Sequence, residues 1–120
     1  MYNVTHTLTT QEQQMDIQAI KNEAQTAAIT AEQAFIAQHG EMAYCGFAWV
    51  DVFVERTNSK EAKALAEMGF KKSYRPKTMN LWTCGSYHGQ SMDVKEAGAR
   101  AYADVLTKHG FRAYMGSRAD

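Results

Sequence analysis

The sequence predicts an α+β fold, with a long N-terminal helix followed by an antiparallel sheet and two further helices. Three observations predict this class. Residues 11–39 contain neither proline nor glycine, residues 42–55 alternate aromatic and β-branched side chains, and a succession of helix, glycine and strand occurs twice. The 120 residues are enough to bury a hydrophobic core without disulfides or metal.

The first expected element is a helix that begins at a capping box on Thr9 or Thr10 and ends before Gly40. Its continuity through the β-branched cluster at 26–30 stays open at this point. The apolar side chains of this helix form a narrow stripe of mostly small residues: Ile17, Ile20, Ala24, Ala27, Ala31, Ala34 and Phe35.

So narrow a stripe would be poorly buried against a small sheet, whereas small residues allow two helices to approach closely. We therefore expect the helix to contact another subunit, which makes the chain a homo-oligomer. This interpretation divides the chain into residues 1–40, an oligomerisation helix, and residues 41–120, a ligand-binding α+β domain.

The next expected element is a central strand, because residues 42–55 are apolar on both faces. One face carries Phe47, Trp49 and Phe53, and the other carries alanine and valine. A helix capped by Asn58 or Ser59 should then run through Met68 and end at Gly69.

Two strands, Phe70–Tyr74 and Lys77–Thr83, are expected around a turn at Pro76. A helix over Asp93–His109 ends at Gly110, and "FRAYM" is the last strand. The apolar face expected for this helix comprises Val94, Ala97, Ala101, Val105 and Leu106.

An internal similarity supports this order, because "ALAEMGFKKSY" aligns with "DVLTKHGFRAY". After the first helix the elements read β-α-β-β-α-β, the pattern of ferredoxin-like folds. Helices in such a fold cover one face of the sheet and leave the other face free.

This topology gathers distant segments at one edge of the sheet: the start of the first strand, the end of the third, the loop "GSYHGQS" and the end of the fourth. Amides at a helix start near Ser91, together with Arg118, would suit a phosphate, and Trp82 and Tyr87 offer flat faces for a base. The candidate ligand-binding residues are Trp82, Tyr87, His88, Gln90, Ser91, Arg112 and Arg118. Arg112 begins the last strand and would reach this pocket only through a subunit interface. The competing interpretation is an ordinary helix cap beside a surface loop.

Composition argues against several classes of protein. The 13 basic residues equal the 13 acidic ones, which disfavours nucleic acid as a partner. No apolar run is long enough for a membrane span, and the N-terminus lacks the pattern of a signal peptide, so we expect a soluble, cytoplasmic protein. Cys45 and Cys84 lack redox or zinc spacing, and we expect reduced, mostly buried thiols. A metal site that joins them to His88 is disfavoured.

Catalytic motifs are missing from the sequence, including a nucleophile elbow, a P-loop and paired catalytic carboxylates. His88 is the only plausible general base, and no evident nucleophile lies beside it. We therefore expect binding without turnover, no cofactor and no enzymatic activity.

The segments "YCGFAWVDVF", "GQSMDVKEAGARAYADVL" and "AYMGSRAD" resemble the small phage-encoded anti-Thoeris proteins. The resemblance implies an oligomeric sponge in the host cytoplasm that sequesters cyclic ADP-ribose-type signals, and in some cases cyclic oligonucleotides, and so counteracts an anti-phage defence.

Two alternatives stay open. Residues 46–50, "GFAWV", are similar to the core of the RNA-recognition-motif signature. However, Cys45 stands where the signature begins with Lys or Arg, and Val52 stands where it ends with an aromatic residue. A module of that kind would bind single-stranded nucleic acid on the aromatic sheet face. In the third hypothesis, the long helix is the interaction surface and the α+β part only supports it.

Overall fold

The computed structural model describes residues 10–41 and 44–120, and the side chains of the first helix from Asp16 onward. Thr9 and the start of the predicted strand at Met42 lie outside the described residues, and the side chains of the predicted capping boxes lie outside the described side chains. The elements are α1 (Thr10–His39), β1 (Gly46–Phe53), α2 (Lys60–Glu67), β2 (Lys71–Lys72), β3 (Thr78–Leu81), α3 (Met92–Lys108) and β4 (Arg112–Ala119).

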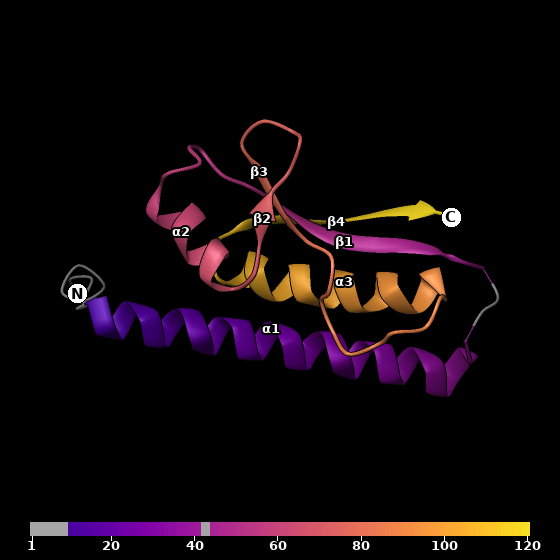
Figure 1. Ribbon diagram of the computed structural model, residues 1–120. Coiled ribbons are helices and arrows are strands. Elements are labelled where there is room, and N and C mark those ends of the chain that lie inside the picture. The colour runs from indigo at the N-terminus through magenta and orange to yellow at the C-terminus, as the bar shows by residue number, and fades with distance from the viewer. Residues whose placement is uncertain (1–9, 42–43) are drawn as a thin grey trace.

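The four strands form one sheet in the order β2-β3-β1-β4, and every neighbouring pair is antiparallel. Figure 1 shows α2 and α3 on one side of this sheet and α1 on the far side of α3. The predicted α+β class, with a long N-terminal helix before an antiparallel sheet, is confirmed. No helix covers the second face of the sheet in the described part of the chain, and this face is called the open face below.

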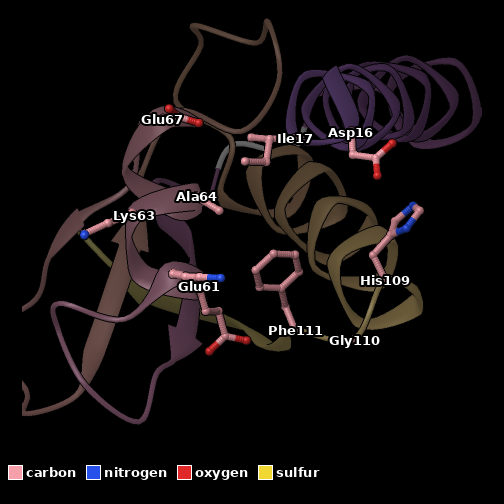
Figure 2. A pocket seen from close by; sticks show the side chains of 10 residues that line it. Asp16, Ile17, Glu61, Lys63, Ala64, Glu67, His109, Gly110 and Phe111 are labelled. Atoms are coloured by element: carbon pink, nitrogen blue, oxygen red, sulfur yellow. The ribbon is translucent and has the colours of Figure 1, made fainter. Parts of the chain in front are cut away.

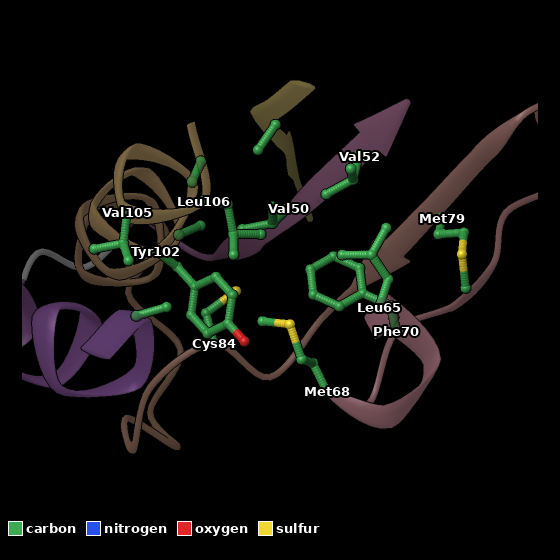
Figure 3. Packing of buried hydrophobic residues seen from close by; sticks show 14 of the residues in the cluster. Val50, Val52, Leu65, Met68, Phe70, Met79, Cys84, Tyr102, Val105 and Leu106 are labelled. Atoms are coloured by element: carbon green, nitrogen blue, oxygen red, sulfur yellow. The ribbon is translucent and has the colours of Figure 1, made fainter. Parts of the chain in front are cut away.

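The alternation along β1 sorts its side chains between the two faces of the sheet. Val50 and Val52 are fully buried beneath the helices, whereas Trp49 is half-buried and Phe53 exposed on the open face. Figure 3 shows the core between the sheet and the helices, with the ring of Tyr102 beside Cys84 and the ring of Phe70 beside Leu65. The core therefore lies on one side of the sheet only.

The predicted ends of α2 and α3 are confirmed by their caps. Ser59 Oγ accepts the amide of Ala62, and Gly69 and Gly110 have φ angles of 103° and 97°, which favour glycine. The two predicted strands around Pro76 are shorter than expected. One reason is that Lys77 has a φ of 57°, where the backbone leaves the extended conformation.

α3 buries more of its surface than the predicted face, because it lies between the sheet and α1. The residues of α3 buried in addition to Val94, Val105 and Leu106 are Gly98, Ala99, Tyr102 and Ala103. Ala97 and Ala101, which were predicted to belong to the apolar face, are only half-buried.

α1 is one continuous helix of 30 residues and ends at His39, before Gly40 with a φ of 72°. Part of the stripe that was predicted to face another subunit is used within the chain: Ala24 belongs with Ala28 to the same core as Val50, and Ile17, Ile20 and Ala27 pack against that core. Ala34, which also belongs to the stripe, is exposed. Small side chains at these positions let two helices approach closely, which is why a thin stripe suffices. Association between copies stays a prediction. Among the described residues, no helix has both the length and the hydropathy to cross a membrane.

Candidate functional site

The predicted gathering of segments at one edge of the sheet does occur. β3 ends at Leu81, opposite Val50, so a loop over residues 82–91 lies beside the first half of β1. Two backbone hydrogen bonds attach this loop and the start of α3 to the residues around β1: Gly46 N donates to Gln90 O at 3.3 Å, and Met92 N donates to Tyr44 O at 2.9 Å. The end of β4 joins them, because Asp120 N donates to Cys45 O at 3.1 Å.

Three of the seven predicted site residues line one small cavity at this edge, the loop-edge cavity. Its lining includes Trp82, Tyr87 and His88, together with Phe47 and Lys95. The cavity measures about 120 Å³, below the range of about 300–1,000 Å³ of sites that enclose drug-sized ligands. It can accommodate at most a part of a nucleotide.

Gln90 and Ser91 hold the chain together at this edge. Ser91 is buried, and its Oγ accepts the amide of Val94 at 3.4 Å as the cap of α3. The side-chain carbonyl of Gln90 accepts the thiol of Cys45 at 3.4 Å. Met92 N and Val94 N both bond within the chain, as they would in an ordinary helix cap, so neither amide is left for a phosphate in this structure.

Tyr87 links the loop to the end of α1. Its hydroxyl donates to Glu41 Oε1 at 2.5 Å and accepts the amide of Ser91 at 3.1 Å. Burial, and then the bond to the Glu41 carboxylate, raise the pKa of Tyr87. The side chain passes so close to Gly89 that a Cβ there would lie 2.2 Å from the hydroxyl. The hydroxyl of Tyr87 is therefore committed to the loop, although its side chain lines the cavity.

Sequence reasoning missed Glu32, which holds the same loop from α1. Its side chain is buried, and Oε1 accepts the amides of Ser86 at 3.0 Å and Tyr87 at 3.2 Å. Glycines make room for the carboxylate, because a Cβ on Gly85 would lie 2.3 Å from Oε1 and one on Gly98 would lie 2.6 Å from Oε2. The glycine-rich loop thus binds an anion, but the anion belongs to the protein. A signal was present, since Glu32 continues the four-residue spacing of Ala24 and Ala28.

The pH dependence of stability should report on Glu32. Burial raises the pKa of Glu32, and the amides of Ser86 and Tyr87 oppose this effect. The folded carboxyl therefore keeps its proton at a pH where the unfolded chain, with a pKa of about 4.3, has released it. Stability should fall as pH rises through that window.

Urea unfolding between about pH 4 and pH 8 can measure this loss in the wild type and in Glu32→Gln, which keeps an acceptor oxygen but cannot ionise. As the pH rises, the wild type should lose stability relative to Glu32→Gln. A constant difference would contradict the raised pKa of Glu32.

Aromatic side chains cover the open face of the sheet. Trp49 and Trp82 are stacked, with ring centroids 4.5 Å apart and planes 22° from parallel, and Phe47 meets Trp82 edge-on at 6.2 Å. Gly116 lies opposite Trp49 in the sheet, and a Cβ there would come within 2.6 Å of the indole nitrogen. Glycine at this position lets the indole lie close to the backbone of β4.

A larger concavity, the sheet-face groove, lies beyond the tryptophan pair and measures about 660 Å³. This volume is in the range of small-molecule sites. Its lining residues are Trp49, Asp51, Phe53, Arg75, Thr78, Arg112, Tyr114, Met115, Gly116 and Ser117. Arg112, the least expected of the predicted residues, therefore lies in a different concavity from Trp82, Tyr87 and His88.

Cations lie over the aromatic rings at both ends of β1. Arg112 is 4.6 Å from the centroid of Phe53, while Arg118 and Lys95 are 5.7 Å and 5.2 Å from that of Phe47. Such contacts contribute about 0.5–1 kcal/mol each at exposed sites. The contact between Arg112 and Glu55 is long, at 3.9 Å, and both side chains are largely exposed, so it constrains Arg112 little.

A third concavity of about 500 Å³ lies among α1, α2 and the turn before β4. Figure 2 shows the ring of Phe111 at its centre, between Ala64 and His109. Its rim mixes carboxylates such as Asp16 with bases such as Lys63. None of the seven predicted ligand-binding residues lines it.

Cys84 gives no sign of a reactive thiol. Cys84 is buried, and burial is the main cause that raises its pKa to about 12, so the thiol stays protonated at neutral pH. Among the residues that the structure describes, no group of three or more histidine, cysteine or acidic side chains is arranged to hold a metal ion.

Comparison of the chain with protein-family models, with curated proteins and with solved structures finds no match. The functional argument therefore depends on the side chains themselves. The feature that distinguishes them is an aromatic surface with arginines at both ends, next to a loop held by an internal carboxylate.

Proposed function

We propose that this chain binds a nucleotide-type ligand on the open face of its sheet and sequesters it without cleaving it. The observation that carries the proposal is the juxtaposition of the stacked Trp49–Trp82 pair with Arg112 and Arg118, which lie over phenylalanine rings on either side of it. Aromatic faces bind bases by stacking, and guanidinium groups bind phosphate oxygens in pairs. Both kinds of group converge on one uncovered surface.

Side chains, and not the loop amides, would hold the phosphates. The amides of Ser86 and Tyr87 already bond to Glu32, and the start of α3 is capped by Ser91. Arg112 and Arg75, which line the sheet-face groove, are the cations that a phosphate in the groove would meet.

The resemblance to anti-Thoeris sponges suggests the biological form of this binding. In that form, a cyclic ADP-ribose-type signal is sequestered in the host cytoplasm and denied to a defence effector. An uncovered aromatic surface with cations supports ligand capture. The strand order β2-β3-β1-β4 with antiparallel neighbours supports the ferredoxin-like assignment on which the site was predicted.

Single-stranded nucleic acid is the second candidate, and the length of the aromatic row favours it. The row follows β1 from Phe47 to Phe53, six residues apart, which corresponds to about 20 Å of extended chain. A surface of that length can stack more than one base. The zero net charge of the whole chain weighs against this candidate, because nucleic-acid binding depends on an excess of cations.

Calorimetric titration separates the two candidates. The ligands are cyclic ADP-ribose isomers, cyclic di- and trinucleotides and single-stranded oligonucleotides, each at two salt concentrations. We expect sub-micromolar binding of a small nucleotide and recovery of the intact ligand after denaturation. Trp82→Ala should weaken this binding about tenfold, the order expected for loss of one stacking partner.

Tyr44→Ala is the matched control, because Tyr44 is 56% exposed and lines neither the loop-edge cavity nor the sheet-face groove. Recovery of cleaved ligand would contradict binding without turnover. Strongly salt-dependent binding of oligonucleotides alone would favour the second candidate. If none of these ligands binds, the proposed function is wrong.

A further inference from the structure

The sheet-face groove contains one carboxylate among the described residues that line it, Asp51, in the middle of an otherwise aromatic and cationic surface. In the sheet it lies between Asn80 on β3 and Tyr114 on β4. A carboxylate at this place weakens the attraction of the groove for phosphate. We therefore expect Asp51 to contact a part of the ligand other than the phosphate.

Asp51 is held in a fixed orientation. The indole nitrogen of Trp49 donates to Asp51 Oδ2 at 3.0 Å, and the close approach of Trp49 to Gly116 keeps that indole in place. An ionised carboxylate offers about four acceptor positions, so this bond leaves capacity for further donors. A ligand in the groove thus meets an acceptor that needs no rearrangement.

Exposed aromatic rings lie beside this acceptor. Tyr114, directly opposite Asp51, is 64% exposed, and Phe53, two residues along β1, is 40% exposed. Arg112 lies over Phe53 at 4.6 Å. A base that stacks on either ring has its hydrogen-bonding edge near Asp51 and its phosphate within the region of Arg112.

We infer that the groove selects guanine nucleotides through Asp51, an inference that rests on the proposed nucleotide binding and favours guanine-containing cyclic nucleotides over cyclic ADP-ribose, whose base is adenine. Guanine presents two adjacent donors on its Watson–Crick edge, N1–H and the N2 amino group, and a carboxylate can accept both. Adenine presents an acceptor, N1, beside its N6 amino group, and that acceptor would face an ionised oxygen. Sites that hydrogen-bond a donor discriminate strongly against analogues that lack it.

The test compares GMP, IMP and AMP, which share the ribose and phosphate and differ in the base edge. We expect binding in the order GMP, IMP, AMP, with at least tenfold between the first and the last. Asp51→Asn retains an oxygen for the Trp49 indole but replaces one acceptor by a donor. It should weaken GMP binding about tenfold and leave AMP binding unchanged or stronger.

Asp104→Asn is the matched control, because it removes the same charge from an exposed position on α3 outside the groove. It should leave all three affinities unchanged. Equal binding of the three nucleotides, or an equal effect of Asp51→Asn on each, overturns the selection of guanine while nucleotide binding stands. If no nucleotide binds in either this series or the larger panel, the proposed function itself fails.

Discussion

Replacing Glu32 by alanine should lower the free energy of unfolding by about 3 kcal/mol. The substitution removes the acceptor of two backbone amides, those of Ser86 and Tyr87, and a hydrogen bond to a charged group contributes about 1.5–3 kcal/mol. It also empties a space that Gly85 and Gly98 leave for the carboxylate. Urea unfolding followed by tryptophan fluorescence measures the change.

Gly98→Ala tests the same contact from the other side. In the wild type the new methyl group would lie 2.6 Å from Glu32 Oε2, so the carboxylate must move and stability should fall. In the Glu32→Ala background the obstruction is gone, and alanine in a helix is better than glycine by about 1 kcal/mol. The sign of the Gly98→Ala effect should therefore reverse between the two backgrounds. An increase in stability in both would show that the carboxylate is not held between these segments.

The sequence was sufficient to predict the elements whose cause is local. The cap at Ser59 begins α2, and the positive φ angles of Gly69 and Gly110 end α2 and α3. Both effects depend on neighbours in the chain. The alternation along β1 likewise follows from the period of a strand, so the division of its side chains between two faces was predicted correctly, whereas which face the helices cover was not. The gathering of segments at one sheet edge followed from the topology alone.

The spacing of Glu32 hinted at its burial, but its partners could not be predicted because they are 54 and 55 residues away in the chain. An acidic residue in a helix is normally solvent-exposed, and only the packing of α1 on α3 turns this one inward. The same packing accounts for the apolar stripe that was expected to face another subunit. Without it, the loop amides looked available to a phosphate.

The split of the predicted site into two concavities has a similar cause. Trp82 was predicted to stack on a base without a neighbouring ring. In the structure it is stacked on Trp49, which lines the sheet-face groove. The register between β1 and β4 places Arg118 beside Phe47 and Arg112 beside Phe53, at opposite ends of the face. Strand register depends on long-range pairing, which the pattern of one strand does not contain.

Truncating a side chain should cost far more stability on the covered face of the sheet than on the open face. Leu106→Ala, on the covered side, should lower the free energy of unfolding by about 3 kcal/mol, because the side chain is fully buried and its removal leaves a cavity. Phe53→Ala, on the open face, should cost less than about 1 kcal/mol, mostly the contact with Arg112. Chemical unfolding of the two variants at several protein concentrations measures both values.

The concentration series distinguishes a ligand surface from an interface between copies. Aromatic residues that the fold does not need are available to a ligand only if no second chain covers them. Any concentration dependence of unfolding, such as association through α1 would cause, should therefore be the same in the wild type and in Phe53→Ala. If Phe53→Ala cost as much as Leu106→Ala and removed a concentration dependence, the open face would be a dimer interface, and the nucleotide would have to bind elsewhere.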